Sequence, residues 1–254
     1  MKRGPAGNGT EFYQIEKVAE EYEAIRFGHP AGMFLDSLHQ KTILEGVGPM
    51  DLSGKRVLDV ACGTGRFSRL FRYRGARVVG LDLSRAMLNQ SRIRGSAEAY
   101  VEAGALALPF KETAFDLAVS VNALNHLPAF EAIIHEMCRV SRRVILGLPH
   151  LHSLLLLNTL YRVLRGWGYR YTRDKTARYP GAPLIYTRYF SERELRVIFE
   201  KNKFKVTACP KCRVIPFLRL PREWVRTAQV VEDLTIRFAG RWGMFMAMTA
   251  ERQH

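Results

Sequence analysis

The sequence predicts an α/β fold in which a doubly wound, mostly parallel sheet of seven strands carries helices on both faces. Short apolar runs without polar alternation suit strands that are buried on both faces, and they alternate with amphipathic stretches of helical period. The connections between them are short, as in parallel sheets covered by helices. The chain has 254 residues, of which 47% are hydrophobic. That is enough for one large domain or two small ones, and it excludes a disordered chain.

Two helices are expected before the first strand. Apolar residues recur at helical spacing between Phe12 and Phe27, and a Gly/Pro-rich stretch at 28–32 ends that pattern. A second helical pattern runs from Met33 to Leu44. We therefore expect residues 1–48 to form an N-terminal helical cap.

Five strands and three helices are expected next, in a core unit of residues 49–149. The strands are expected at 56–61, 77–82, 99–102, 115–121 and 143–148. The helices are expected at 66–73, 84–94 and 129–140. Because each link is short, successive strands are expected to lie parallel, with a helix crossing over most of the connections.

The alternation stops after Pro149. Residues 150–189 form a basic and aromatic insertion after the fifth strand, and 151–167 projects as an amphipathic helix with a leucine-rich face and an arginine-bearing back. Residues 190–254 are expected to complete the sheet. Their elements are a helix at 191–201, capped by Ser191 with Glu194 at the capping-box position, and strands at 204–208 and 243–251.

Charge is divided unevenly along the chain. Residues 1–137 carry 16 Lys and Arg against 16 Asp and Glu, whereas 138–254 carry 23 against 8 and account for the net charge of +15. The basic half is expected to face phosphate, nucleic acid or an acidic membrane surface. No apolar run is long enough for a membrane span. Met1–Thr10 is unlike a secretory signal, and four scattered cysteines fit a reducing compartment. A cytoplasmic protein is expected.

The strongest chemical signal lies at the end of the first expected strand, where Asp59 precedes the loop 61–65, Ala-Cys-Gly-Thr-Gly. Such a loop brings a ligand against backbone N–H groups and a helix N-terminus. A dinucleotide fingerprint would need glycine at Ser68, and Asp59 would repel a pyrophosphate. The carboxylate suits a ligand with an ammonium group instead. Asp82, at the end of the second strand, can accept both hydroxyls of a ribose.

At these residues the chain resembles the class I S-adenosylmethionine (SAM)-dependent methyltransferases, closest to their small-molecule and quinone-type branch. The resemblance covers 16–148, and more loosely 190–251. Four motifs carry it in order: 57–65, 80–88, Leu108-Pro-Phe with Phe115-Asp116, and 122–127. It implies a Rossmann-like fold, SAM as cofactor bound by the unit 49–149, and methyl transfer by direct displacement.

The resemblance also implies roles for single residues. Asp59 would hold the methionine ammonium of SAM, Asp82 would bind the ribose, and Leu83 and Met87 would lie against the adenine. Gly104 stands where the family usually has an acid that accepts from the adenine amino group. The full set of expected cofactor-binding residues is Asp59, Ala61, Gly63, Thr64, Gly65, Asp82, Leu83, Met87, Gly104, Ala105, Leu106, Asn122 and Leu127.

Signals on the acceptor side are weaker. His126, after the fourth strand, is the candidate catalytic base, although methyl transfer from a sulfonium often needs only positioning. The insertion 150–189 is expected to be a lid over the pocket of a small or medium-sized, lipid-like or anionic acceptor, with contact to an anionic membrane surface as the alternative. Cys209 and Cys212 lack the second pair that structural zinc requires, so no metal site is expected.

Two other classes of function compete. An RNA methyltransferase would use the basic half for phosphate contacts. The fourth-strand motif, however, is Asn122-Ala-Leu-Asn125 and not the Asn/Asp-Pro-Pro-aromatic pattern of enzymes that methylate base amino groups. A non-enzymatic SAM-binding protein is disfavoured by the intact loop and its two carboxylates. The sequence leaves the acceptor, the methylated atom and the oligomeric state open.

Overall fold

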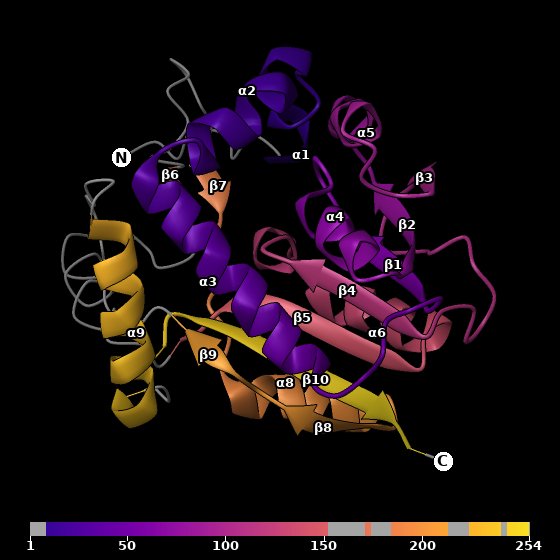
Figure 1. Cartoon of the computed structure of the whole chain (residues 1–254). Helices are drawn as coiled ribbons and strands as arrows, with labels where there is room; N and C mark the ends of the chain where they lie inside the picture. The colour runs from indigo at the N-terminus through magenta and orange to yellow at the C-terminus, as the bar shows by residue number, and fades with distance from the viewer. Residues whose placement is uncertain (1–8, 152–170, 174–183, 213–223, 240–242, 254) are drawn as a thin grey trace, which may run out of the picture.

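A mixed β-sheet forms the centre of the computed structural model, which describes residues 9–151, 171–173, 184–212, 224–239 and 243–253. Its strands are β1 (Arg56–Val60), β2 (Arg77–Asp82), β3 (Ala99–Glu102), β4 (Leu117–Val121), β5 (Arg143–Pro149), β8 (Phe204–Ala208), β9 (Lys211–Cys212) and β10 (Phe245–Arg252). Seven of them follow the order β3-β2-β1-β4-β5-β10-β8, and the short β9 pairs with β10 (Figure 1). The predicted doubly wound sheet is confirmed.

Strand direction determines where a ligand can bind. β1 to β5 are parallel, and β10 runs antiparallel to both β5 and β8. Strand order reverses between β1 and β4, so the loops that follow these two strands leave toward opposite faces. In open α/β sheets the crevice at such a reversal, at the carboxyl ends of the strands, is where ligands bind.

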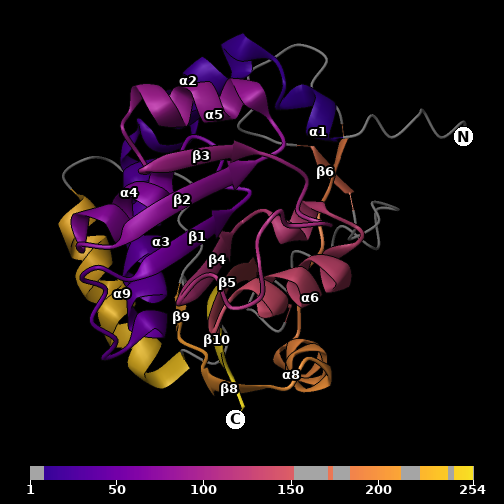
Figure 2. The same ribbon diagram turned by 90° about the vertical axis from the view of Figure 1, so that its right-hand side faces the viewer.

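Helices cover both faces of the sheet. On one face lie α3 (Pro30–Val47), α4 (Arg66–Tyr73) and α9 (Val225–Ala239), and on the other α6 (Phe130–Val140) and α8 (Glu192–Lys201), as Figure 2 shows. α5 (Arg85–Ile93) packs on β2 and β3, and α2 (Glu16–Phe27) packs on α3 and α5. This arrangement leaves the carboxyl ends of β1 and β2 next to the N-terminal helices.

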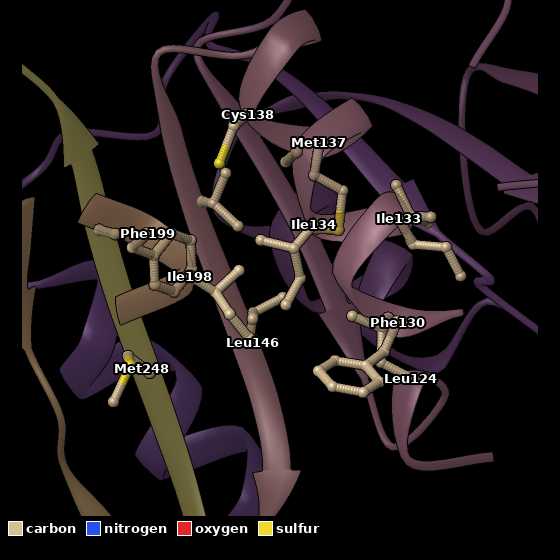
Figure 3. Close-up of a cluster of buried hydrophobic side chains, with 14 of the residues drawn as sticks. Leu124, Phe130, Ile133, Ile134, Met137, Cys138, Leu146, Ile198, Phe199 and Met248 are labelled. Atoms are coloured by element: carbon tan, nitrogen blue, oxygen red, sulfur yellow. The ribbon is translucent and has the colours of Figure 1, made fainter. Parts of the chain in front are cut away.

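The core between the sheet and α6 is closely packed. Ile134 of α6 lies against Leu146 of β5, and Met137 of α6 and Ile198 and Phe199 of α8 belong to the same cluster (Figure 3). Burying each such side chain contributes roughly 1.5–3 kcal/mol. The apolar runs that predict the central strands supply side chains to both faces: Val57 belongs to the cluster under α3 and α4, and Leu58 to the cluster under α6.

Four of the expected elements have the predicted bounds, and most of the others differ by one or two residues at an end. The helix at 66–73 and the strands at 77–82, 99–102 and 204–208 agree residue for residue. Ser84 and Ser191 cap α5 and α8 through their side-chain oxygens. The helix expected at 33–44 is wrong at both ends: α3 runs from Pro30 to Val47, because His29 caps it and Pro30 fits its first turn.

The helix expected over Phe12–Phe27 is wrong at its start. A four-residue α1 (Gly9–Phe12) is followed by a turn, and α2 begins at Glu16. The turn is held by the Ser84 hydroxyl, which donates to the Tyr13 carbonyl oxygen. The 15-residue α9 and the short β9 were not predicted at all. Three exposed apolar residues of α9, Val230, Val231 and Leu234, obscure its amphipathic pattern.

The insertion 150–189 is described only in part. β6 (Tyr171–Arg173) and β7 (Leu184–Tyr186) pair as antiparallel strands. The amphipathic helix expected at 151–167 lies outside the described residues, apart from Leu151. Within the described part of the chain, no helix combines the length and the apolar character that crossing a membrane requires.

Candidate functional site

The loop after β1 has a backbone that few residue types can adopt. Ala61, Gly63 and Gly65 have positive φ angles of 56°, 55° and 81°. A Cβ atom at Gly65 would lie 2.3 Å from the Ser91 hydroxyl oxygen and from the Ser96 Cβ, so only glycine fits there. A Cβ at Gly63 would meet no atom within 4 Å. The loop is therefore packed tightly against Ser91 and Ser96 at Gly65, whereas the space beside Gly63 is open.

Asp59 is a buried carboxylate at the end of β1, with only 2% of its surface exposed. The Ser68 hydroxyl donates a 2.6 Å hydrogen bond to its Oδ2 atom. Burial raises the pKa of Asp59 to about 7, the Asp82 charge adds to this rise, and the hydrogen bond from Ser68 opposes it. A cationic ligand group beside Asp59 would favour its ionised form.

Asp82 joins the two loops that end β1 and β2. Its Oδ2 atom accepts from the Gly63 backbone N–H at 2.8 Å, and its Oδ1 atom accepts from the Ser84 N–H at 2.8 Å. Burial raises the pKa of this carboxyl group, and the backbone N–H groups oppose the rise. An ionised carboxylate has about four acceptor positions. The Leu83 N–H also acts on this carboxylate, so Asp82 has acceptor capacity left for a ribose hydroxyl.

The residues expected against adenine divide into an open and a packed group. Leu83 and Leu106 are 51% and 58% exposed. Gly104 is exposed as well, and a Cβ there would meet no atom within 4 Å. Met87, in contrast, is buried against Ala19 of α2, and Ala105 packs on the core under α6. The open group follows β2 and β3, which are neighbours in the sheet.

Two residues that sequence reasoning missed support the loop. The two residues are Ser68 and Glu23. Glu23 of α2 accepts a 2.6 Å hydrogen bond from the hydroxyl of buried Thr64. Arg69 of α4 donates to both carboxylate oxygens of Glu23 at 2.8 Å. In the sequence, Ser68 stands out only as a missing glycine of a dinucleotide fingerprint. Glu23 lies 41 residues before Thr64, and no local pattern indicates such a contact.

The residues after β4 form a second polar group. Asn122 has a positive φ of 55°, and its side-chain amide lies 3.3 Å from Nδ1 of His39 on α3. His126 lies in a short 3-10 helix, η1 (Leu124–His126). Its Nε2 atom is 3.0 Å from the Asn125 amide nitrogen, and its Nδ1 atom is 3.4 Å from the Thr187 hydroxyl. These contacts orient the ring beside the end of the insertion.

Leu127 packs against the core under α6. The structure therefore brings Asp59, Gly63 and Asp82 together directly and leaves Asn122, His126 and Leu127 in a separate group that follows β4. Among the described residues, no group of three or more His, Cys, Asp or Glu is arranged as a metal site. Cys209 is a free thiol whose pKa burial raises to about 12.

Comparisons with known proteins identify the same region. Residues 58–144 match a family model described as a methyltransferase domain. The chain is 34% identical over 117 residues to the malonyl-[acyl-carrier protein] O-methyltransferase of Hamiltonella defensa subsp. Acyrthosiphon pisum, a match that covers 46% of this chain and 44% of that protein. For the enzyme of the same description from Salmonella typhimurium the identity is 33% over 143 residues, covering 47% and 57%. The chain spans about half the length of the curated relatives it matches.

The fold has solved counterparts over nearly the whole chain. Magnesium protoporphyrin IX methyltransferase from Synechocystis PCC 6803, solved with bound SAH, superposes with a TM-score of 0.64 at 16% sequence identity. The superposition covers 96% of this chain and 98% of that chain. At this identity the likeness establishes the architecture alone, which is that of a Rossmann-like methyltransferase.

Proposed function

Because the chain contains a class I SAM-dependent methyltransferase domain, we propose that it transfers the methyl group of SAM to a small or medium-sized acceptor that is lipid-like or anionic. The observation that carries this proposal is the buried Asp59 beside the open loop at Gly63. It suits a ligand that brings its own positive charge. Asp82, 2.8 Å from the Gly63 nitrogen, adds an acceptor for a ribose hydroxyl on the same side.

The residues present fit SAM. When bound, SAM supplies a methyl group that is attached to a sulfonium. The leaving group is a neutral thioether, so its departure needs no acid. Asp59 would hold the ammonium group of the amino-acid tail, and Asp82 would bind the ribose. The exposed side chains of Leu83 and Leu106 would cover the adenine and exclude water from it. In such a reaction the protein acts mainly by orientation, which can supply about 7–11 kcal/mol.

The acceptor is proposed to enter at the carboxyl end of β5, beneath the insertion 150–189. A bridge between His150 and Phe190 brings the two ends of the insertion together there, and the Leu151 N–H donates to the Phe190 carbonyl oxygen at 2.8 Å. The described strand β7 contacts η1 and α1. These contacts support a lid close to His126, which is the proposed base where the acceptor has a proton to lose.

The proposed acceptor class is supported by the charge of the chain and by the relatives. The curated relatives are named for O-methylation of a malonyl group carried by a protein, which supports an anionic or acyl-like acceptor here. The basic half of the chain, with 23 Lys and Arg against 8 Asp and Glu after residue 137, supplies cations for such an acceptor. The same charge is the feature that would serve an RNA substrate.

Binding and methyl-transfer measurements together test the function and the acceptor class. Calorimetry is expected to detect binding of SAM and of SAH, the demethylated product, but not of NAD. Methyl transfer from labelled SAM is then measured with acyl and lipid carboxylates, RNA, DNA and anionic vesicles across a range of salt concentrations. Replacing Leu156 and Leu160, which lie outside the described residues, by polar residues is expected to abolish transfer with SAM affinity retained. No SAM binding would refute the function. Salt-sensitive methylation of RNA would replace the acceptor class.

A further inference from the structure

Residues Tyr13–Glu23, here named the strap, are fixed at both ends to the loops that carry the proposed cofactor contacts. At one end, the Tyr13 carbonyl oxygen accepts from the Ser84 hydroxyl at 2.6 Å, and the Gln14 amide nitrogen donates to the Leu83 carbonyl oxygen at 3.0 Å. At the other end, Glu23 accepts from the Thr64 hydroxyl at 2.6 Å. The strap therefore spans from the loop after β2 to the loop after β1.

Glu23 of the strap makes charged contacts with the loop after β1 and with α4. Its carboxylate accepts from Thr64 and twice from Arg69, and Nε of Arg94 lies 3.9 Å from its Oε1 atom. Arg69 also donates to the Thr64 carbonyl oxygen at 3.0 Å, so the same guanidinium holds the glycine loop and the strap. Burial alone would raise the pKa of Glu23, but the hydrogen bonds from Arg69 and Thr64 outweigh it and lower the pKa. Glu23 is therefore ionised at neutral pH.

Between its fixed ends the strap packs on Met87, which is one of the residues expected near adenine. Ala19 is fully buried against Ala86 and Met87 of α5, and the Tyr13 and Tyr22 rings pack against the same cluster. Figure 1 shows α2 lying between the start of α3 and α5, above the region where β1 and β2 end. A ligand bound to both Gly63 and Leu83 would lie between the two points where the strap is attached.

We propose that Glu23 is a positioning residue that holds the strap closed over the cofactor, so that SAM entry and product release require its contacts with Thr64 and Arg69 to open. This inference rests on the proposed methyl transfer. Opening and closing steps of this kind limit the turnover of many enzymes. Coupling is reciprocal: if closure of the strap strengthens binding, bound ligand must favour closure by the same factor.

The test uses Glu23→Gln, which keeps the shape of the side chain and removes its charge. The control is Glu20→Gln, which changes an exposed carboxyl group one turn earlier on the same helix. Dissociation of SAH is measured by rapid mixing with excess SAM, SAH affinity by calorimetry, and opening of the strap by tryptic cleavage at Lys17 and Arg26. The ligand-free melting temperature reports folding. If Glu23→Gln fails to fold, Arg69→Lys tests the same contacts, because lysine cannot reproduce the guanidinium geometry.

In Glu23→Gln the SAH dissociation rate is expected to rise about tenfold, because hydrogen bonds to a charged group are lost. Protection of Lys17 and Arg26 by SAH is expected to weaken in parallel, and Glu20→Gln is expected to behave as wild type. If wild-type protein binds SAH but the folded variant releases it at the wild-type rate, the role of Glu23 is refuted and the proposed function stands. If wild-type protein does not bind SAH, both proposals fail.

Discussion

Replacing Asp59 by asparagine is predicted to stabilise the ligand-free protein at pH 8 while weakening its binding of SAM. Burial raises the pKa of Asp59 from 3.8 to about 7. Between these two pH values the folded protein holds a proton that the unfolded chain has released, so the free energy of unfolding falls as the pH rises. The resulting destabilisation is absent below about pH 4 and complete above about pH 7. Asparagine does not ionise, so the variant lacks this destabilisation.

The magnitude follows from the change in pKa. A rise from 3.8 to about 7 corresponds to about 4 kcal/mol in total, of which about 3 kcal/mol develops between pH 5 and pH 8. Solvent screening does not reduce this value, since the side chain is almost fully buried. A changed hydrogen bond with Ser68 would affect the variant at both pH values, so it cancels when the two are compared.

The assay is denaturant unfolding of wild type and Asp59→Asn at pH 5 and pH 8. The stability of the variant relative to wild type is expected to increase by about 3 kcal/mol between these pH values. Glu112→Gln, at an exposed carboxyl group, is the control and should show no such increase. A difference between variant and wild type that is the same at pH 5 and pH 8 would refute the elevated pKa of Asp59, and with it the electrostatic argument for a cationic ligand.

Three further substitutions test the same site. Ser68→Ala removes the hydrogen bond that opposes the rise in the Asp59 pKa. Because the ionised form of Asp59 is the one proposed to bind SAM, the pH at which SAM affinity is half-maximal should move upward in calorimetric titrations. An unchanged pH profile would contradict this. Asp82→Ala should weaken SAM binding by about 1.5–3 kcal/mol through loss of charge-assisted hydrogen bonds, and unchanged affinity would exclude the ribose contact. Gly104→Asp should keep or strengthen SAM binding, because a Cβ there meets no atom within 4 Å and its φ is not positive; much weaker binding by a folded variant would place the adenine contact elsewhere.

The part of the site that could be predicted from sequence is built from short continuous segments. Asp59, Gly63 and Gly65 lie within one strand–loop–helix unit, and Asp82 ends the next strand, so chain order alone places them at one edge of a parallel sheet. The same locality explains the agreement of the strand and helix bounds in this region. β1 is an apolar run that pairs with a strand on each side, and α4 begins directly after Gly65, whose left-handed backbone ends the loop.

The part that could not be predicted depends on contacts between distant segments. α2 begins at Glu16 instead of Phe12 because the turn before it is bound to Leu83 and Ser84. Glu23 resembles any other acid on the polar face of an amphipathic helix until Thr64 and Arg69 are brought against it. Neither hydrophobic period nor residue spacing contains information about a tertiary hydrogen bond of this kind.

The N-terminal helices explain why Asp59 has no strong cationic partner among the described residues. Two arginines lie in the first turns of α4, close to the loop, and either could have paired with a carboxylate at the site. Instead, Arg66 is paired with Asp36 of α3 and Arg69 with Glu23 of α2. The Arg66 charge consequently has only a minor effect on the Asp59 pKa. By binding these two arginines, α2 and α3 leave Asp59 and Asp82 available for a ligand that brings its own positive charge, so their contribution to the site is electrostatic as well as steric.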